Sequence, residues 1–156
     1  MTDIIIDTCT LVHANNSESP YFDSSVELIN KMFGNQTLCT VDDGFSLNET
    51  QNKSYIALEY IKHLQPGSLG FNLIVHLALN QRLDFVSNKI PNNVKKYTER
   101  IIRNKKDRYF IRVTYNSVEK TLASHDFTDY QIDKRKLIKR DLNISIVTAE
   151  EINDEL

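Results

Sequence analysis

Carboxylates follow three short apolar segments of the chain, within two residues of the point where each segment ends. The segments and their acids are residues 4–6 with Asp7, residues 37–41 with Asp42 and Asp43, and residues 121–124 with Asp126. If these segments are parallel strands, their carboxyl ends lie at one edge of a sheet, where open α/β folds bind ligands. Carboxylates brought together there repel one another, and a divalent cation such as Mg²⁺ relieves the repulsion through oxygen ligands. Such ions can activate water against a phosphodiester bond.

Each acid by itself also has an ordinary structural explanation. An Asp after a strand often caps the following helix, although Thr8 could cap that helix without Asp7. The run DDG at residues 42–44 has the composition of a turn, and Asp126 could likewise begin a turn. The prediction of a site therefore depends on several acids sharing one sheet edge, and not on any one of them.

The predicted elements are arranged so that these acids can meet. The Ile-Ile-Ile run at residues 4–6 is typical of a strand buried on both faces. Strands are predicted over residues 4–6, 37–41, 121–124 and 143–147. Helices are predicted over residues 23–33, 51–63, 71–79, 92–103, 109–116 and 134–141. The segment 109–116 is assigned to a helix because parallel neighbouring strands need a crossover connection. Alternating strands and helices predict the α/β class: a three-layer α/β/α sandwich with a mostly parallel central sheet.

Length and composition favour one soluble domain. The chain has 156 residues, of which 40% are hydrophobic and 26% charged, so we expect a single domain over residues 1–156. Two cysteines are too few for a secreted disulfide scaffold. The longest apolar-rich stretch, residues 69–79, is shorter than the roughly 20 residues that a membrane span requires. We therefore expect a cytoplasmic protein with reduced thiols and no membrane partner.

The formal net charge of −2 conceals an uneven distribution. Residues 1–88 hold 4 basic and 10 acidic residues, whereas residues 89–112 hold 9 basic and only 2 acidic residues. Exposed cations beside an acidic site could neutralise the phosphates of a nucleic acid, although a solvated helix face would have the same composition. The candidates for phosphate contact are Lys95, Lys96, Arg103, Lys105, Lys106 and Arg108. Tyr109, interleaved with them, could stack on an unpaired base.

Four motifs, in this order along the chain, resemble those of the PIN-domain nucleases, the family of the VapC-type toxins. The first is IIIDTCTLVHAN at residues 4–15, and the second is IALEY at residues 56–60. The third is DRYFIRVTYNSVEKTLASHDFTDY at residues 107–130, and the last is NISIVTAEEIN at residues 143–153. Two details depart from the family pattern. Cys9 stands where Asn or Ser is more common, and Asp129 lies one residue beyond the usual second acid.

The resemblance implies a metal-dependent endoribonuclease. It implies an acidic quartet of Asp7, Glu59, Asp107 and Asp126 that holds one or two Mg²⁺ or Mn²⁺ ions, and Asp129 is a further candidate ligand. A water molecule activated by the metal would attack the phosphorus of an RNA phosphodiester. Thr8 and Ser124 are candidates for holding that water or a phosphate oxygen, and each could instead act as a cap.

Several alternatives remain open at this stage. Glu49 is a rival of Glu59 for the second acid of the quartet. His125 adjoins Asp126, but the side chains of adjacent residues diverge, which argues against a proton shuttle. The domain could also be an inactive PIN-like adaptor that binds RNA or protein, or a structure-specific DNA nuclease. A toxin-type ribonuclease would need an antitoxin or another regulatory protein, and analogy with the family suggests a homodimer.

Overall fold

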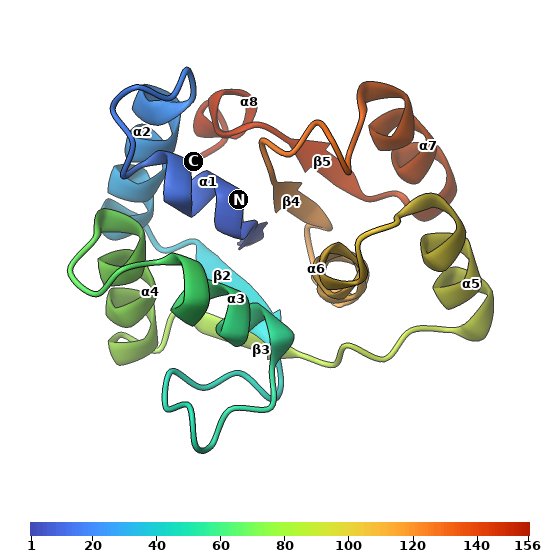
Figure 1. Ribbon diagram of the computed structural model, residues 1–156, viewed down its shortest axis with the longest axis horizontal. Coiled ribbons are helices and arrows are strands. Elements are labelled where there is room, and N and C mark those ends of the chain that lie inside the picture. Colours follow the sequence, from blue (N-terminus) through green and yellow to red (C-terminus); the bar gives the residue numbers. More distant parts are fainter.

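Five strands form the centre of the computed structural model, which describes residues 1–156 (Figure 1). They are β1 (Asp3–Ile6), β2 (Leu38–Asp42), β3 (Leu83–Val86), β4 (Thr121–Ala123) and β5 (Ser145–Val147). Their order across the sheet is β3-β2-β1-β4-β5, and every pair of neighbours runs parallel. The predicted α/β class with a parallel central sheet is therefore confirmed.

Helices flank this sheet, and every predicted helix is present. They are α1 (Thr8–His13), α2 (Phe22–Gly34), α3 (Tyr55–His63), α4 (Leu69–Leu79), α5 (Asn92–Ile101), α6 (Lys105–Asn116), α7 (Ile132–Leu142) and α8 (Ala149–Asn153). The largest differences from prediction are at the starts of α3 and α6. α3 begins only after Ser54, whose side chain caps it by accepting a hydrogen bond from the amide of Ala57. α6 begins at Lys105, because the side chain of Asn104 caps it in the same way.

The strand β3 was missed in the sequence, and its position explains why. It lies at the edge of the sheet and pairs only with β2. Phe85 in this strand is 54% exposed, and a charged residue, Asp84, precedes it. An edge strand is covered on fewer sides than a central one, so it needs no continuous apolar run of the kind that marks β1.

The topology places the ends of β1 and β4 side by side. Strands β2 and β3 follow β1 on one side of the sheet, and β4 pairs with β1 on its other side. Ile6 is in register with Ala123, so that Asp7 and Ser124 follow their strands at the same sheet edge. In open α/β sheets, ligands bind outside the carboxyl ends of the strands at such a reversal of strand order.

Two fully buried tyrosines fix the helices that face this edge. Tyr60 of α3 donates a hydrogen bond from its hydroxyl to the carbonyl of Ile6, the last residue of β1, at 2.5 Å. Tyr130 donates from its hydroxyl to the carbonyl of Asp107 in the first turn of α6, at 3.0 Å. Since each hydroxyl would be costly to bury without a partner, these bonds fix both α3 and α6 relative to the sheet edge. None of the helices has the length and apolar character needed to cross a membrane.

Candidate metal centre

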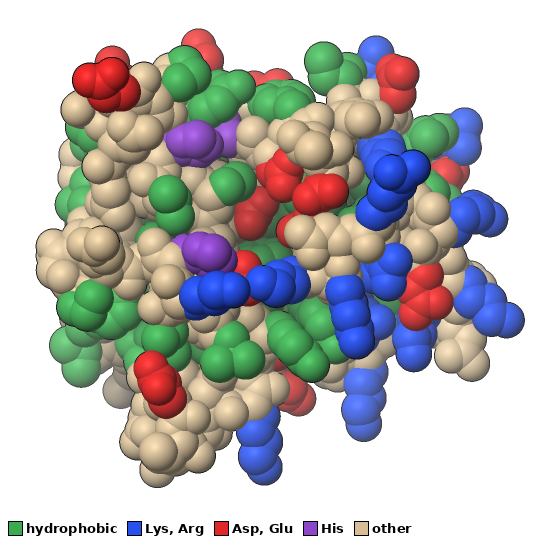
Figure 2. Space-filling model, viewed as in Figure 1, with side chains coloured by type: hydrophobic (Ala, Val, Ile, Leu, Met, Phe, Trp, Pro, Cys, Tyr) green, Lys and Arg blue, Asp and Glu red, His purple; other side chains and the backbone are tan.

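Three carboxylates converge beyond the carboxyl ends of β1 and β4. Asp107, in the first turn of α6, meets Asp126 and Asp129 from the loop after β4, and one ligand atom of each lies within 4.8 Å of the others. Asp107 is buried, whereas Asp126 and Asp129 are half-buried. Figure 2 shows acidic side chains gathered in a hollow near the middle of this face, with Lys and Arg side chains beside and below them. We call Asp107, Asp126 and Asp129 the Asp triad.

A turn in the backbone brings Asp129 into this group. The Oδ1 atom of Asp126 accepts hydrogen bonds from the amides of Thr128 and Asp129, each at 2.9 Å. This geometry folds the chain back on itself, so Asp129 approaches Asp126 despite its departure from the spacing of the family motif. The second oxygen of Asp126 takes no part in this turn. Asp126 is thus both the turn residue and a member of the Asp triad.

Asp7 borders the Asp triad in a cavity of about 300 Å³, which is also lined by Thr8, Glu59, Asp107 and Asp126. The Oδ2 atom of Asp7 accepts a hydrogen bond from the Ser124 hydroxyl at 2.6 Å. Burial raises the pKa of Asp7 most strongly, the bond from Ser124 partly offsets that rise, and the nearby charge of Asp126 adds to it. A carboxylate in this position gains from a neighbouring cation.

The strongest sign of a missing positive charge is at Asp107. Burial, followed by the close carboxyl group of Asp129 and the charges of the surrounding carboxylates, raises the pKa of Asp107 to about 9. Its Oδ2 atom is buried and has no hydrogen-bond partner, and the same is true of the nearby Thr8 Oγ1. Buried polar atoms in folded proteins nearly always have partners. Because the ligand atoms of the Asp triad are all carboxylate oxygens, these residues fit a hard divalent cation such as Mg²⁺ or Mn²⁺.

Glu59 lines the cavity but does not belong to the Asp triad. Its Oε1 atom lies 2.9 Å from Lys106 Nζ, and its Oε2 atom lies 3.4 Å from His63 Nε2. The predicted quartet is therefore divided: Asp107 and Asp126 converge with Asp129, Asp7 adjoins them, and Glu59 is held by an ion pair. Sequence spacing could not show this, since Lys106 approaches from a different helix.

The rival acids lie elsewhere. The Oδ1 atom of Asp42 accepts a short hydrogen bond from the Ser54 hydroxyl, so this carboxylate connects the end of β2 to the start of α3. Asp43 and Glu49 are exposed in the loop between those two elements. None of the three lines the cavity beside the Asp triad.

Ser124 and His125 have structural roles next to the carboxylates. Ser124 is fully buried and, besides donating to Asp7, accepts a hydrogen bond from the amide of Asp126 at 3.1 Å. It therefore positions two acids. The Nε2 atom of His125 accepts from the amide of Ala149 at 3.1 Å, and its ring stacks on Tyr21 at 4.4 Å between centroids. Burial lowers the pKa of His125 to about 4, so this ring is neutral at pH 7.

No family model, curated protein or solved structure in the comparisons matches this chain. The resemblance to the PIN-domain nucleases is therefore carried by the residue motifs alone. What the fold and the site establish is a parallel α/β protein whose acidic group could hold a metal ion.

The basic residues predicted to contact phosphate differ in their surroundings. Lys95, Lys96, Arg103, Lys105 and Lys106 are exposed. Arg108 is half-buried, and its guanidinium donates to the carbonyls of Ile102, Glu99 and Arg103 at 2.7, 3.2 and 3.4 Å, near the end of α5. Arg108 therefore stabilises the connection between α5 and α6.

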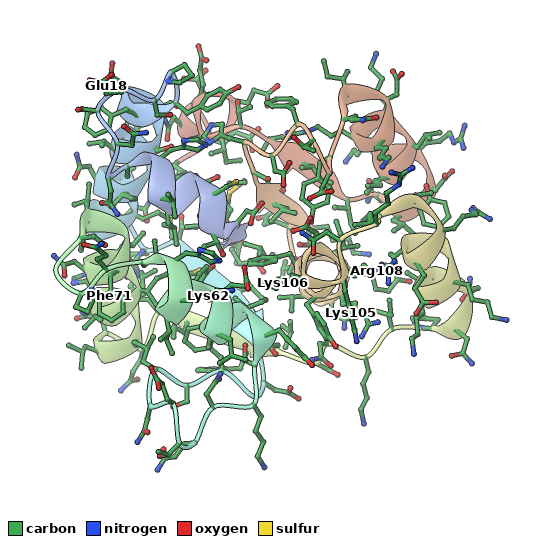
Figure 3. The ribbon with its side chains drawn as sticks, in the orientation of Figure 1. Glu18, Lys62, Phe71, Lys105, Lys106 and Arg108 are labelled. Carbon is green, nitrogen blue, oxygen red and sulfur yellow. The ribbon has the colours of Figure 1, made fainter.

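A further cation, Lys62, was not identified from the sequence. It lies on α3, and Figure 3 shows Lys62 and Lys106 between α3 and α6. Lys62 follows Glu59 by three residues, a spacing that places two side chains on the same side of a helix. That spacing was the available signal, but it becomes informative only once α6 is known to lie opposite.

Proposed function

We propose that this protein is a metal-dependent endonuclease that acts on RNA, the activity that its PIN-like motifs imply. One observation carries the proposal: the Asp triad lies at the reversal of strand order, and a buried oxygen of Asp107 has no partner. A set of close carboxylates without cations between them is unfavourable, and metal-dependent phosphodiester hydrolysis is a chemistry that uses such a set.

Each residue of the centre has a distinct role in this proposal. Asp107, Asp126 and Asp129 would hold the ion, and Asp7, positioned by the hydrogen bond from Ser124, lines the same cavity. An ion held there would supply Lewis-acid chemistry and would lower the pKa of a water molecule that attacks phosphorus. The unpartnered Thr8 hydroxyl in the same cavity can donate to a phosphate oxygen or to that water.

The phosphate backbone is held by cations at the edge of the cavity. The Lys106 ammonium, paired with Glu59, and the neighbouring Lys62 lie next to the acids and can contact phosphate oxygens. Glu59 then acts as a positioning residue for Lys106. Contacts of this kind carry no sequence information, but they make binding dependent on salt concentration.

The experiment that tests the proposal compares carboxamide variants with a matched control. The variants are Asp107→Asn, Asp126→Asn and Asp129→Asn, and the control is Asp133→Asn, which replaces an exposed Asp of α7. Each protein is incubated with labelled single-stranded RNA, single-stranded DNA and DNA flaps, with Mn²⁺ or with chelator. We expect RNA cleavage that requires Mn²⁺, survives in the control and falls by at least about 100-fold in each triad variant.

The other outcomes each contradict part of the proposal. RNA cleavage that persists with chelator, or in all three triad variants, would show that the Asp triad is not the catalytic centre. Cleavage confined to DNA flaps would identify a structure-specific DNA nuclease. RNA binding without cleavage in any metal would identify an adaptor.

A further inference from the structure

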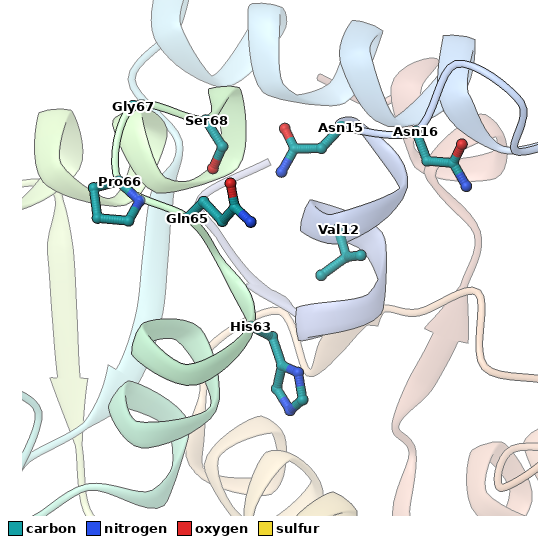
Figure 4. A pocket seen from close by; sticks show the side chains of 8 residues that line it. All are labelled: Val12, Asn15, Asn16, His63, Gln65, Pro66, Gly67 and Ser68. Carbon is teal, nitrogen blue, oxygen red and sulfur yellow. The ribbon is translucent and has the colours of Figure 1, made fainter.

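A second, larger cavity adjoins the metal centre. It has a volume of about 620 Å³ and lies between the end of α1 and the connection from α3 to α4 (Figure 4). Two residues, Val12 and His63, line both this cavity and the one beside the Asp triad. A chain molecule whose phosphate lies at the Asp triad can therefore extend directly into the second cavity.

The lining of this second cavity is polar but carries no carboxylate, lysine or arginine. In Figure 4 the amide groups of Asn15 and Gln65 converge with the Ser68 hydroxyl on one space. Asn15 and Gln65 are exposed, so their amides are available to a ligand. Each amide offers donors and an acceptor, and the Ser68 hydroxyl, whose oxygen caps α4 by accepting from the amide of Phe71, offers its proton. Val12 and Pro66 add apolar lining, whereas the ring of His63 is directed away from this space, with its Nε2 atom 3.4 Å from Glu59.

This chemistry argues against a second metal ion and favours a nucleobase. A second metal ion would need carboxylates, and the lining has no lysine or arginine to pair with a phosphate. A nucleobase is flat, has an apolar face, and has donors and acceptors along its edge. Asn and Gln amides form paired hydrogen bonds with such edges. The volume lies within the range of about 300–1,000 Å³ that is typical of small-molecule sites.

We propose that this cavity binds an unpaired nucleobase of the RNA strand that is cleaved at the Asp triad, and that Asn15 and Gln65 determine which base is accepted. The inference rests on the proposed function, because it assigns the base next to the scissile phosphate. A base held by its hydrogen-bonding edge cannot also be paired, so the substrate is single-stranded at this position. Lys62 and Lys106, near the Asp triad, contribute affinity for the phosphate backbone, and the amides of Asn15 and Gln65 contribute sequence preference.

The first test measures which members of a labelled, single-stranded RNA library of randomised sequence are cleaved, and at which bond. The wild-type protein, the double variant Asn15→Ala, Gln65→Ala, and the control Asn30→Ala are compared, the control replacing an exposed Asn of α2. We expect the wild type and the control to prefer particular bases at one position at a fixed distance from the cleaved bond. The double variant should lose about tenfold of that preference, as the loss of one or two hydrogen bonds implies. Equal preference in the wild type and the double variant would overturn the proposal.

A second measurement separates this inference from the nuclease proposal. The side-chain amide signals of Asn15 and Gln65 are followed by NMR in ¹⁵N-labelled Asp107→Asn protein, as short homopolymeric RNAs of each base are added with chelator. We expect both signals to shift, most strongly with the base that the library identifies. Shifts without cleavage by the wild-type protein in any metal would support the base site and contradict the nuclease. Cleavage without base preference and without shifts would support the nuclease and overturn the base site, and the absence of both would overturn both proposals.

Discussion

The hydroxyl of Ser124 donates a 2.6 Å hydrogen bond to the Oδ2 atom of Asp7, joining the carboxyl ends of β1 and β4. The same hydroxyl oxygen accepts from the amide of Asp126. One small buried side chain thus sets the relative position of two acids that are 119 residues apart in the sequence. The carboxylates are held by the core of the fold as well as by the loops that carry them.

Replacement of Ser124 by Ala should disturb both stability and the site. Asp7 would keep its burial but lose a donor, so its pKa should rise further and the free energy of unfolding should fall by about 1–3 kcal/mol. Urea denaturation measures the stability, and Mn²⁺ affinity measures the effect on the site. Ser17→Ala, at an exposed position before α2, is the matched control. A Ser124→Ala protein as stable as that control would contradict the role assigned to this bond.

The pKa of Asp107 predicts how the metal-free protein responds to pH. Its folded-state pKa of about 9 lies above the ordinary value of about 3.9, so the folded state holds a proton that the unfolded state has lost. The stabilising contribution is complete below about pH 4 and is lost as the pH rises toward about 9. With chelator, the wild type should therefore lose stability relative to Asp107→Asn over this range, by at most about 1.4 kcal/mol per pH unit.

Addition of Mn²⁺ should reverse that loss at alkaline pH, since the ion takes the place of the proton. Urea denaturation of both proteins at several pH values, with and without Mn²⁺, gives the comparison. A constant difference between the wild type and Asp107→Asn across the range would show that Asp107 does not titrate as assigned.

His125 should show the opposite dependence. Burial lowers its folded-state pKa to about 4, below the ordinary value of about 6.5, so the stabilising contribution is present above pH 6.5 and is lost as the pH falls toward 4. NMR titration of the imidazole signals should give a midpoint near 4 for His125. A midpoint near 6.5 would mean that the ring is open to water and that its packing on Tyr21 is wrong.

Lys106 should contribute to RNA affinity through charge alone. Lys106→Ala is expected to weaken binding similarly for all sequences and to reduce the slope of log affinity against log salt by about 1. Fluorescence anisotropy of labelled RNA measures both the affinity and its salt dependence. Chelator is added so that the RNA is not cleaved during the measurement. Lys31→Ala, on α2 and paired with Glu27, is the control outside the basic residues 89–112. An unchanged salt slope for Lys106→Ala would show that this ammonium does not meet phosphate.

The sequence was most informative for features that local residue patterns and general rules of sheet topology are enough to predict. A buried β-branched run followed by Asp identifies β1 and Asp7, and the alternation of elements predicts the parallel sheet. Asp126 follows from the same reasoning after β4. These features depend on local sequence and on a general rule of sheet topology, so no knowledge of tertiary contacts was needed.

The remaining features depend on contacts between distant segments. The convergence of Asp129 with Asp107 results from the turn at Asp126 and the packing of α6, and neither is encoded in a spacing rule. Glu59 has the expected place on α3, but its ion pair with Lys106 exists only because α6 lies opposite. The cavity lined by Asn15 and Gln65 joins two loops that no motif connects.

The most direct test of the central claim is the position of a bound ion. Crystals of the wild-type protein soaked with Mn²⁺ should give an anomalous scattering peak among the carboxylate oxygens of Asp107, Asp126 and Asp129, at metal–oxygen distances of about 2.0–2.3 Å. The peak should be absent in crystals of Asp107→Asn treated in the same way. A wild-type protein that shows no peak at the Asp triad, or binds Mn²⁺ only elsewhere, would contradict the account.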